Sequence, residues 1–478
     1  MLSRHAAATL TEQLAQRYAE RIRERLLAPG ARLPSVRDCA QRHGVSPHTV
    51  VAAYDLLLAQ GLIEARRQRG FFVRAPAAAR DPAPSNPPRS PAAAPVDAAA
   101  LIRSMFHAPG GRPAPGGGTL PPEWLDLSLL AGTLRRLLAT ERLAPLALHY
   151  GDPAGDPRLR AALAQKLADF GVAAAPEQLV TTLGATQALD IVSRALLAPG
   201  DAVLVDEPGW AVEFARLAQL GMRVLPVPRG PDGPDLNVME ALIATHQPRL
   251  YVTVSVLHNP TGASLSLGHA HRLLTLAQAH DFRIVEDDTY AWLAPPHAAR
   301  VAALDGLQRT IYVSGFSKIL APGWRVGFIA APPELTARLV DVKLLTSLTT
   351  PALTERSVAL CLEQGALRRH ADRVRERLDA ARARSLAMAA EHGCAPAPGS
   401  AAGRGLFAWL DTGVDTDRLA QSLLDDGWLI APGSLFHAAR APTPLMRLNV
   451  ANGADRAFWR AFAERRAELR RRARPASA

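Results

Sequence analysis

Apolar residues near the N-terminus recur at helical spacing. Leu14, Tyr18, Ile22 and Leu26 follow one another at intervals of four. Residues spaced by three or four share one face of a helix, so the pattern predicts an amphipathic helix over residues 10–27. Gly30 follows this segment and marks a break before the next element.

Two shorter helices come next, and the sequence marks their ends. Ser35 suits the N-cap of the first, and Gly44 suits the position after its last turn. Ser46 and Pro47 then supply a second cap and a proline at the first helical position. Two short helices joined by a tight glycine-containing turn predict a helix-turn-helix.

A hairpin is predicted directly behind these helices. Residues 62–66 and 71–74 read as two short strands, and the run RQRG at 67–70 joins them. A hairpin with a basic tip after a helix-turn-helix is a wing. The module over residues 1–75 is therefore predicted to be a winged helix-turn-helix.

Residues 76–104 are rich in proline and alanine and contain almost no large apolar side chain. Such a segment cannot build a core and is predicted to be a linker. It divides the chain into the small module over residues 1–75 and a large domain over residues 105–478.

In the large domain, short apolar runs alternate with amphipathic helical patterns. The runs cover residues 202–205, 250–256, 283–285 and 310–313, and the helical patterns cover residues 159–170, 185–197 and 269–280. This alternation predicts an α/β sheet covered on both faces. Ligands of such sheets bind at the carboxyl ends of the strands, where several polar residues of this chain fall.

The net charge of the chain bears on the kind of partner it binds. The formal net charge is +11, and basic side chains cluster in the first 75 residues and again at 465–474. A basic chain is compatible with nucleic acid, although the second cluster lies on a helical pattern and reads as a solvated helix face. Cys39, Cys361 and Cys394 are far apart, which predicts reduced thiols and no metal site.

No apolar stretch is long enough for a membrane helix, and the N-terminus lacks the pattern of a signal peptide. The sequence therefore predicts a soluble, cytoplasmic protein without a membrane partner.

The position of polar residues in the small module favours double-stranded DNA. Ser46, His48 and Thr49 stand at the N-terminal end of the second short helix, where short side chains can reach base edges. Arg37, and the wing residues Arg67 and Arg69, could neutralise phosphates. A helical protein-interaction module is the alternative, but helix, turn, helix and wing in this order favour DNA.

The strongest chemical signal in the large domain is Lys318, in the run SGFSK after an apolar strand. A lysine in a semi-buried site can lose its proton and form a Schiff base. Arg325, seven residues later, is a fixed cation suited to a phosphate, and Ser317 can add a hydroxyl.

Further residues fit pyridoxal 5′-phosphate (PLP), which needs a phosphate cradle, a carboxylate, a partner for its phenolic oxygen and a flat group against its ring. The run TLGATQ at 182–187 opens a helix and offers N–H groups. The run EDDTY at 286–290 supplies the carboxylate. Asn259 or Tyr290 can bond the phenolic oxygen, and Trp210 can stack on the ring. Taken singly, these residues also have plain structural interpretations.

Two resemblances extend this interpretation. The run RLPSVRDCAQRHGVSPHTVVAAYDLLLAQGLIEARRQRGFFV closely resembles the GntR-type winged helix-turn-helix. The resemblance implies that Arg37, Ser46, His48, Thr49 and Gly70 contact DNA.

Residues 115–460 resemble the fold-type-I PLP enzymes, the aspartate-aminotransferase superfamily, in the order and spacing of their motifs. The resemblance implies an α/β PLP-dependent transferase domain with a smaller C-terminal α+β subdomain. It also implies that Lys318 holds PLP covalently, that Asp287 pairs with the pyridine nitrogen, and that Asn259 and Tyr290 bond the phenolic oxygen. The residues implied to hold the phosphate are Ala185, Thr186, Ser317 and Arg325. Tyr150 is implied to reach the phosphate of a neighbouring subunit, and Arg447 to bind a substrate α-carboxylate. Gly315 departs from the pattern, because many relatives have a phosphate-binding serine there.

Both domains in this order resemble the MocR subfamily of bacterial regulators. That resemblance implies a head-to-tail homodimer and a PLP domain that senses PLP or a small amino compound. Two alternatives are a working aminotransferase with an accessory DNA module, and a DNA-binding scaffold without cofactor. Lys318, Asp287 and Arg325 together argue against the scaffold.

Overall fold

The structure is a computed structural model that describes residues 8–23, 27, 30–66, 69–74, 114–138, 140–397, 400 and 404–473. The chain divides into two compact units, Met1–Arg112 and Pro113–Ala478. The linker predicted over residues 76–104 lies outside the described residues.

The N-terminal unit contains three helices and a hairpin: α1 (Leu10–Arg23), α2 (Val36–His43), α3 (Pro47–Ala59), β1 (Ile63–Arg66) and β2 (Gly70–Val73). The apolar faces of the helices meet in a small core that includes Tyr18 and Tyr54, whose rings lie edge to face at 5.9 Å. The predicted winged helix-turn-helix is thereby confirmed.

The predicted caps account for the turn between α2 and α3. The Ser35 hydroxyl accepts the Asp38 N–H, and the Ser46 hydroxyl accepts the Thr49 N–H, both at 3.1 Å. Gly44 ends α2 in the left-handed region at φ 64°, where a glycine carries no steric cost. Local hydrogen bonds therefore fix the start of α3, the end that the sequence assigns to DNA.

The wing differs from the predicted hairpin by one additional strand segment. Arg32 forms an antiparallel bridge with Phe72, and Leu33 donates its N–H to the Phe71 carbonyl at 2.9 Å. Residues before α2 thus pair with β2 and join the wing to the helices. Nothing in the short run before Ser35 marks a strand, because its pairing partner lies some forty residues later in the chain.

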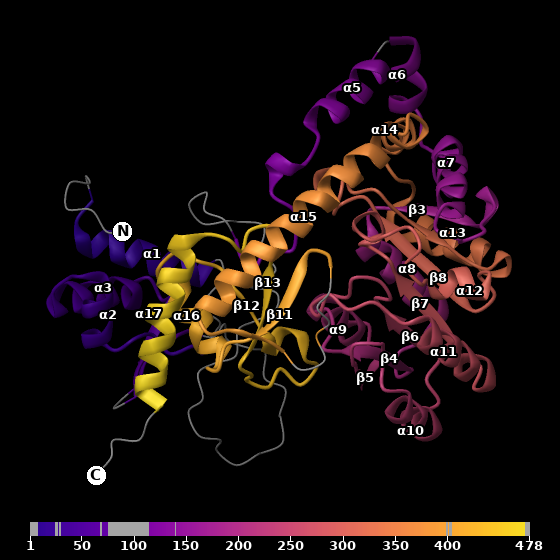
Figure 1. Ribbon diagram of the computed structural model, residues 1–478. Helices are drawn as coiled ribbons and strands as arrows, with labels where there is room; N and C mark the ends of the chain where they lie inside the picture. Colours follow the sequence, from indigo (N-terminus) through magenta and orange to yellow (C-terminus); the bar gives the residue numbers. More distant parts are fainter. Residues whose placement is uncertain are drawn as a thin grey trace. The chain divides into compact units, whose positions relative to one another are not determined.

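A seven-stranded sheet forms the centre of the large unit (Figure 1). The strand order is β3-β9-β8-β7-β6-β4-β5, and only β9 runs antiparallel to its neighbours. The strands are β3 (Leu179–Thr182), β4 (Ala202–Glu207), β5 (Arg223–Pro228), β6 (Leu250–Thr253), β7 (Arg283–Asp287), β8 (Thr310–Gly315) and β9 (Gly327–Ala330). All four predicted apolar runs contribute strands to this sheet.

Helices cover both faces of the sheet, as the alternating pattern predicts. Along β4, Val203 and Val205 face a cluster with α8 (Ala185–Leu196), α9 (Ala211–Gln219) and α13 (Pro333–Ser347). Leu204 faces the opposite cluster, with α10 (Leu236–His246), α11 (Leu267–Ala279) and α12 (Val301–Asp305). Successive side chains of a strand point to opposite faces, so a continuous apolar run fills both layers.

A second sheet lies in the C-terminal part of the large unit. It is antiparallel, in the order β10-β11-β13-β12, with β10 (Ala395–Pro396), β11 (Phe407–Asp411), β12 (Ala431–Pro432) and β13 (Leu445–Asn449). The remaining helices are α5 (Leu127–Leu137), α6 (Thr140–Ala147), α7 (Pro157–Ala168), α14 (Ala352–Glu363), α15 (Ala366–Glu391), α16 (Thr416–Asp425) and α17 (Arg456–Ala473). This sheet, together with α16 and α17, forms the expected smaller α+β subdomain.

The three cysteines are buried and form no disulfide with one another, which agrees with the predicted reduced thiols. Within the described residues, no helix is long and apolar enough to cross a membrane, and no cluster of side chains has the composition of a metal site.

A buried ion pair anchors the turn after β7. Arg300 and Asp288 are both almost fully buried, and the Arg300 Nε lies 2.6 Å from the Asp288 Oδ2. The Tyr312 hydroxyl donates to the same oxygen at 2.8 Å. Because the charge of Asp288 is compensated only by these groups, removal of the arginine would leave a buried, unpaired carboxylate.

Arg300→Met should therefore lower the free energy of unfolding by about 3–5 kcal/mol. Arg309→Met is the matched control, because Arg309 pairs with the exposed Asp281 and should lose less than about 1 kcal/mol. Denaturant unfolding followed by circular dichroism measures both. Equal losses in the two variants would contradict the anchoring role of the Arg300–Asp288 pair.

Candidate functional site

The candidate site lies where parallel strands of the large sheet end. Trp210 follows β4, Asn259 follows β6, Asp287 ends β7 and Lys318 follows β8. Carboxyl ends of parallel strands meet at one edge of a sheet, so the topology gathers these residues although more than a hundred positions separate the first from the last.

Lys318 lies in the centre of this edge. Its Nζ donates to the Gly118 carbonyl at 2.8 Å. Burial lowers the pKa of Lys318 to about 8, with Arg447 and Arg325 acting in the same direction and Asp287 against them. A lysine with such a pKa is partly neutral near pH 8, and the neutral amine is the nucleophile that attacks a carbonyl.

Of the three consecutive acids at the end of β7, only Asp287 remains available to a ligand. Glu286 accepts the N–H groups of Val301 and Ala302, both at 2.8 Å, and Asp288 holds Arg300. Burial raises the pKa of Asp287 to about 7. A buried carboxylate of this kind is stabilised by a cationic partner placed beside it.

Arg447 links the two sheets at the site. It extends from β13, and its Nη1 donates to the Asn259 Oδ1 at 2.9 Å. Burial lowers the pKa of Arg447 to about 10, and its guanidinium lies 4.3 Å from the centre of the Phe407 ring. Tyr290 also lies at this point, with its ring edge to face with Phe407. Burial raises the pKa of Tyr290, so its hydroxyl stays protonated.

An anion cradle lies at the start of α8. Gly184 caps this helix at φ 87°, and a Cβ at Gly184 would come within 2.5 Å of the Arg325 Nη2. Arg325 donates from Nη1 to the Ser317 Oγ at 3.1 Å and from Nη2 to the Leu183 carbonyl at 2.8 Å. A helix N-terminus, a guanidinium and hydroxyls together suit a phosphate, and the first turn of α8 holds Ala185 and Thr186.

Gly315 matches the tight packing beside this cradle. A Cβ at Gly315 would lie 3.1 Å from the Val326 carbonyl oxygen and 3.6 Å from the Ala185 nitrogen. The neighbouring Ser314 cannot replace the serine of the relatives, because it is buried and donates to the Asp288 carbonyl at 2.7 Å. Ser317 is the hydroxyl of this run that contacts Arg325.

The arrangement fits PLP. The cradle suits the phosphate, and the lowered pKa of Lys318 suits attachment to the aldehyde. Asp287 pairs neither with the Val301 and Ala302 N–H groups nor with Arg300, so this carboxyl suits a protonated pyridine nitrogen. When bound, PLP supplies an electron sink for carbanion chemistry at amino compounds.

Trp210 and Tyr150 complete the set of predicted residues. Trp210 is half-buried at the start of α9 and packs against the core of the large sheet. Tyr150 is 84% exposed and precedes Gly151, whose Cβ position lies 3.6 Å from the Thr350 carbonyl oxygen. Its exposure agrees with a side chain that acts on another subunit.

A buried polar network beside the site was not predicted. Asp206 accepts hydrogen bonds from Arg229 at 3.0 Å, from Thr253 at 2.7 Å and from Tyr251. Burial, together with Arg229, lowers the pKa of the nearby His258 to about 3, so this ring stays neutral. Since His258 precedes Asn259, the network supports the loop that presents the amide. These residues end up together through strand pairing, which no local motif reveals.

The sequence analysis also missed the backbone of Pro115–Thr119, which lies against Arg447 and Lys318. A Cβ at Gly116 would lie 2.4 Å from the Ile430 backbone, so glycine is required there. The run of three glycines at 116–118 was the available signal, because repeated glycine often marks a close backbone approach.

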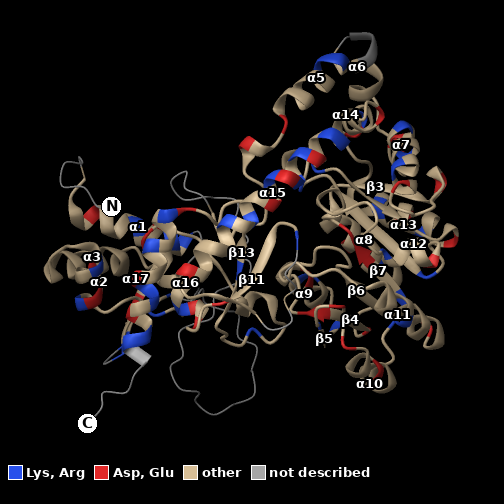
Figure 2. Ribbon diagram, in the orientation of Figure 1, with Lys and Arg blue, Asp and Glu red and all other residues tan. Residues whose placement is uncertain are grey.

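In the N-terminal unit, the candidate DNA residues lie on accessible positions. Arg37, Ser46 and His48 are exposed, and Thr49 is half-buried. Arg69 and Gly70 are exposed at the wing, whereas Arg67 lies outside the described residues. Figure 2 shows basic and acidic residues together along the helices of this unit, so the positions of the basic residues matter more than their number.

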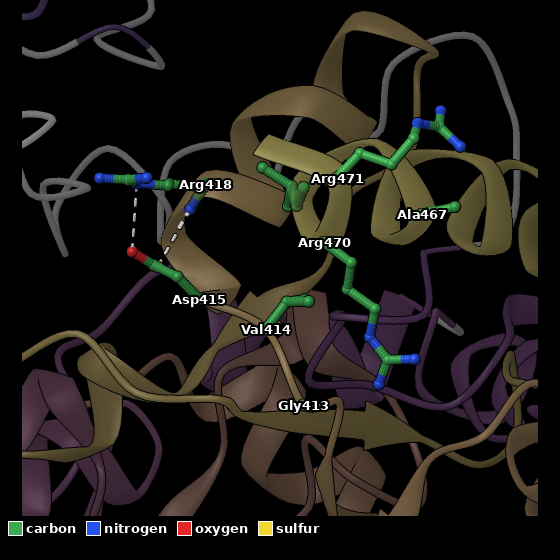
Figure 3. Close-up of a pocket in the computed structure, with 8 residues that line it drawn as sticks. Gly413, Val414, Asp415, Arg418, Ala467, Arg470 and Arg471 are labelled. Carbon is green, nitrogen blue, oxygen red and sulfur yellow. Dashed lines mark hydrogen bonds and ion pairs between the residues drawn. The ribbon is translucent and has the colours of Figure 1, made fainter. Parts of the chain in front are cut away.

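The second basic cluster has several structural contacts. Arg465 pairs with Asp426 at 2.7 Å, and Arg466 donates to the Gly393 carbonyl at the same distance. Arg470 and Arg471 help to line a cavity of about 560 Å³ between α16 and α17 (Figure 3). The cavity is also lined by Arg418, which pairs with Asp415 at 3.4 Å. None of the predicted site residues lines it.

The fold and the site together define a class: a DNA-binding regulator whose second domain is built like a PLP-dependent aminotransferase. Residues 134–463 match the family described as aminotransferase class I and II, and residues 10–73 match the bacterial regulatory proteins of the gntR family. The chain belongs to the aminotransferase class I and II family and carries a gntR-family DNA-binding domain, the architecture of the MocR-like regulators.

Relatives with both parts are known. The chain is 30% identical to the HTH-type transcriptional regulator TauR of Rhodobacter capsulatus, over 90% of each chain. It is 32% identical to the probable rhizopine catabolism regulatory protein MocR of Rhizobium meliloti, over 78% of this chain and 76% of the relative. A solved structure of the α-aminoadipate aminotransferase LysN of Thermus thermophilus, complexed with N-(5′-phosphopyridoxyl)-L-leucine, matches with a TM-score of 0.70 and 27% identity, over 78% of this chain and 95% of LysN.

The raised pKa of Asp287 gives a pH prediction for the cofactor-free protein. An unfolded aspartate ionises near pH 4, whereas the folded carboxyl ionises near pH 7, so Asp287 costs stability increasingly as the pH rises between these values. Asp287→Asn should therefore equal the wild type near pH 3 and exceed its free energy of unfolding by about 4 kcal/mol at pH 8. With PLP added, the wild type should have the higher free energy of unfolding at pH 8, because its Asp287 can pair with the cofactor. Denaturant unfolding at both pH values, with and without PLP, measures this, and a pH-independent difference would contradict the assignment.

Proposed function

We propose that this chain regulates transcription by binding operator DNA through residues 1–75, while residues 105–478 bind PLP and sense PLP or a small amino compound. The observation that carries the proposal is the joint presence of an exposed, capped recognition helix and a buried lysine–carboxylate–arginine site on one chain. Such a regulator acts in the cytoplasm, where its DNA is.

In this proposal α3 enters the major groove with its N-terminal end. Ser46, His48 and Thr49 face base edges or nearby phosphates, and the caps hold them at the start of the helix. Arg37, Arg69 and Gly70 contact the phosphate backbone from α2 and the wing. Arg67 takes the same role by its position in the sequence.

In the PLP domain, Lys318 holds the cofactor covalently, and Asp287 pairs with its pyridine nitrogen. Asn259 and Tyr290 bond the phenolic oxygen, and Trp210 lies against the ring. The phosphate is held by Ala185, Thr186, Ser317 and Arg325. The separation of Glu286, Asp287 and Asp288 into two structural acids and one available acid supports this assignment.

Arg447 binds the carboxylate of the effector. A guanidinium can pair with a carboxylate through two parallel hydrogen bonds, which a lysine could not reproduce. The buried position of Arg447 beside Asn259 and Phe407 would strengthen such a pair and exclude water from it.

A second copy of the chain completes the site. Tyr150 is exposed, and so are Leu148, Leu345 and Leu348; these four residues are called the apolar face below. Large apolar side chains left exposed by one chain are candidates for burial between subunits. We infer a homodimer, head to tail, in which the Tyr150 of each protomer reaches the phosphate of the other.

Turnover is the second candidate function. Lys318, Asp287 and Arg447 are all present, and the chain is 30% identical to the 2-aminoadipate transaminase of Thermus thermophilus over 70% of this chain and 84% of the relative. Incubation with L-alanine and 2-oxoglutarate tests it. Formation of pyruvate beyond one equivalent of protein would show an aminotransferase, and its absence over a panel of amino donors would leave sensing.

DNA binding can be tested on the segment upstream of the protein's own gene. Arg37→Ala should weaken binding and flatten the dependence of log affinity on log salt by about one unit, because one phosphate contact is lost. Arg384→Ala, an exposed arginine on α15, is the matched control and should leave both quantities unchanged. Fluorescence anisotropy between about 50 and 200 mM salt measures them. Identical salt slopes for wild type and Arg37→Ala would remove Arg37 from the interface.

The dimer can be tested by placing a charge on the apolar face. Leu345 is 86% exposed, so Leu345→Asp should fold normally but shift the protein toward monomer, since an unpaired charge at an interface is costly. PLP affinity should fall with the dimer. Leu267→Asp changes an exposed leucine on α11 and serves as the control. Sedimentation velocity measures the mass, and a Leu345→Asp protein as dimeric as the wild type would refute this interface.

A further inference from the structure

The segment Pro115–Thr119, called the strap below, is held by hydrogen bonds to its backbone. All five of its consecutive carbonyl oxygens accept hydrogen bonds. Asn449 donates its backbone N–H to Pro115 at 2.7 Å and its side-chain Nδ2 to Gly117 at 3.1 Å and Thr119 at 2.8 Å. Arg447 Nη2 donates to Gly116 at 2.7 Å and to Gly117 at 3.4 Å. Lys318 Nζ donates to Gly118 at 2.8 Å. The side chains that hold the strap are therefore those of the effector and cofactor site and their neighbour Asn449.

The geometry of β13 explains this convergence. Arg447 and Asn449 are two positions apart on one strand, so their side chains point to the same face. Both are almost fully buried. The strap crosses that face and also donates the Gly116 N–H to the Leu429 carbonyl at 2.9 Å. The strap backbone is thus held without any side chain of its own.

The bond from Arg447 to the strap conflicts with carboxylate binding. A carboxylate forms a bidentate pair with a guanidinium either through Nη1 and Nη2 or through Nε and Nη2. Both geometries use Nη2. In this structure Nη2 donates to the strap, Nη1 donates to Asn259, and the buried Nε has no hydrogen-bond partner among the described residues. A carboxylate that pairs with Nη2 must take it from Gly116 and Gly117.

The strap is also the part of the large unit nearest in sequence to the DNA-binding unit. The unit boundary falls at residues 112 and 113, and the strap begins two positions later. Its other end is anchored by the buried Leu120. Release of residues 114–119 would therefore lengthen the chain between the two anchored units by about 20 Å when extended.

We propose that an effector carboxylate and the strap compete for Arg447, so that effector binding releases the strap and lengthens the tether of each DNA-binding unit. The inference rests on the proposed role of Arg447 in effector binding and adds how that site is regulated. It defines the effector class as a carboxylate, because an amine alone leaves the bonds of Arg447 to the strap intact. A longer tether changes the effective concentration of the second DNA-binding unit at its half-site.

The glycines of the strap provide the variants. A Cβ at Gly116 would lie 2.4 Å from the Ile430 carbonyl carbon and 2.5 Å from the Ala431 nitrogen, so Gly116→Ala prevents the strap from seating while leaving Arg447 unchanged. Asn449→Ala loosens the strap independently by removing two hydrogen bonds. Gly268→Ala is the control, because nothing lies within 4 Å of a Cβ there.

The first measurement needs no ligand. Hydrogen–deuterium exchange of the peptide that covers residues 114–120 is recorded in the full-length, PLP-loaded protein. Exchange should rise by about tenfold or more in Arg447→Ala and Asn449→Ala, because each loses two of the bonds that hold the strap, and should not change in Gly268→Ala. Unchanged exchange in Arg447→Ala would overturn the proposal, whatever ligands bind.

The second measurement adds probes of defined chemistry: L-alanine, 4-aminobutyrate, succinate and, without a carboxylate, n-butylamine. A carboxylate probe that binds should raise strap exchange in the wild type, and butylamine should not. Gly116→Ala should lower the half-saturating concentration of such a probe about three- to tenfold, because the competing state is removed. A carboxylate probe that binds through Arg447 without raising strap exchange would overturn the competition. If no probe binds, the effector role of Arg447 fails, and exchange in Arg447→Ala still shows separately whether Arg447 holds the strap.

Discussion

The candidate site of the large unit depends on the hydrogen bonds of one buried group, the guanidinium of Arg447. It extends from the antiparallel sheet, bonds Asn259 at the edge of the parallel sheet, and bonds the strap that follows the DNA-binding unit. Burial lowers the pKa of Arg447 only to about 10, so the group stays charged at neutral pH. A buried cation demands partners. The partners available in the protein are neutral amide oxygens, which a carboxylate would replace with a gain in electrostatic energy.

The rest of the site follows from how the chain distributes its buried charges. Glu286, Asp288 and Asp206 each accept hydrogen bonds or ion pairs from protein groups, so they build the scaffold, and burial raises the pKa of Glu286 to about 7. Asp287 accepts the Thr289 N–H and Lys318 donates to the Gly118 carbonyl, while burial shifts their pKa values to about 7 and 8, from opposite sides of neutrality. Pairs of groups with opposing shifts of this kind are typical of sites prepared for a ligand. PLP would supply a cation for Asp287 and an aldehyde for Lys318.

Local signals in the sequence were sufficient for the N-terminal unit. Ser35, Gly44 and Ser46 act within three or four residues, so the predicted caps and turn are those of the structure. Strand ends in the large domain were predictable for the same reason, since Asp287 and Lys318 lie two and five residues after the ends of apolar runs. The strap, the strand segment at Arg32 and the Asp206 network were not predictable. Each depends on pairing between residues far apart in the chain, and the role of Ser314 was decided by packing against the turn after β7.

The central claim is that the chemistry of the PLP domain controls how the DNA-binding units engage DNA. The most direct test is the affinity of the full-length protein for the DNA upstream of its own gene, measured with and without PLP, in the wild type and in Lys318→Ala. The account predicts that PLP changes affinity or footprint length in the wild type and that Lys318→Ala, which cannot hold the cofactor covalently, shows the cofactor-free behaviour under both conditions. Equal affinity and footprint for wild type with PLP, wild type without it and Lys318→Ala would contradict the account and leave the DNA-binding unit independent of the site.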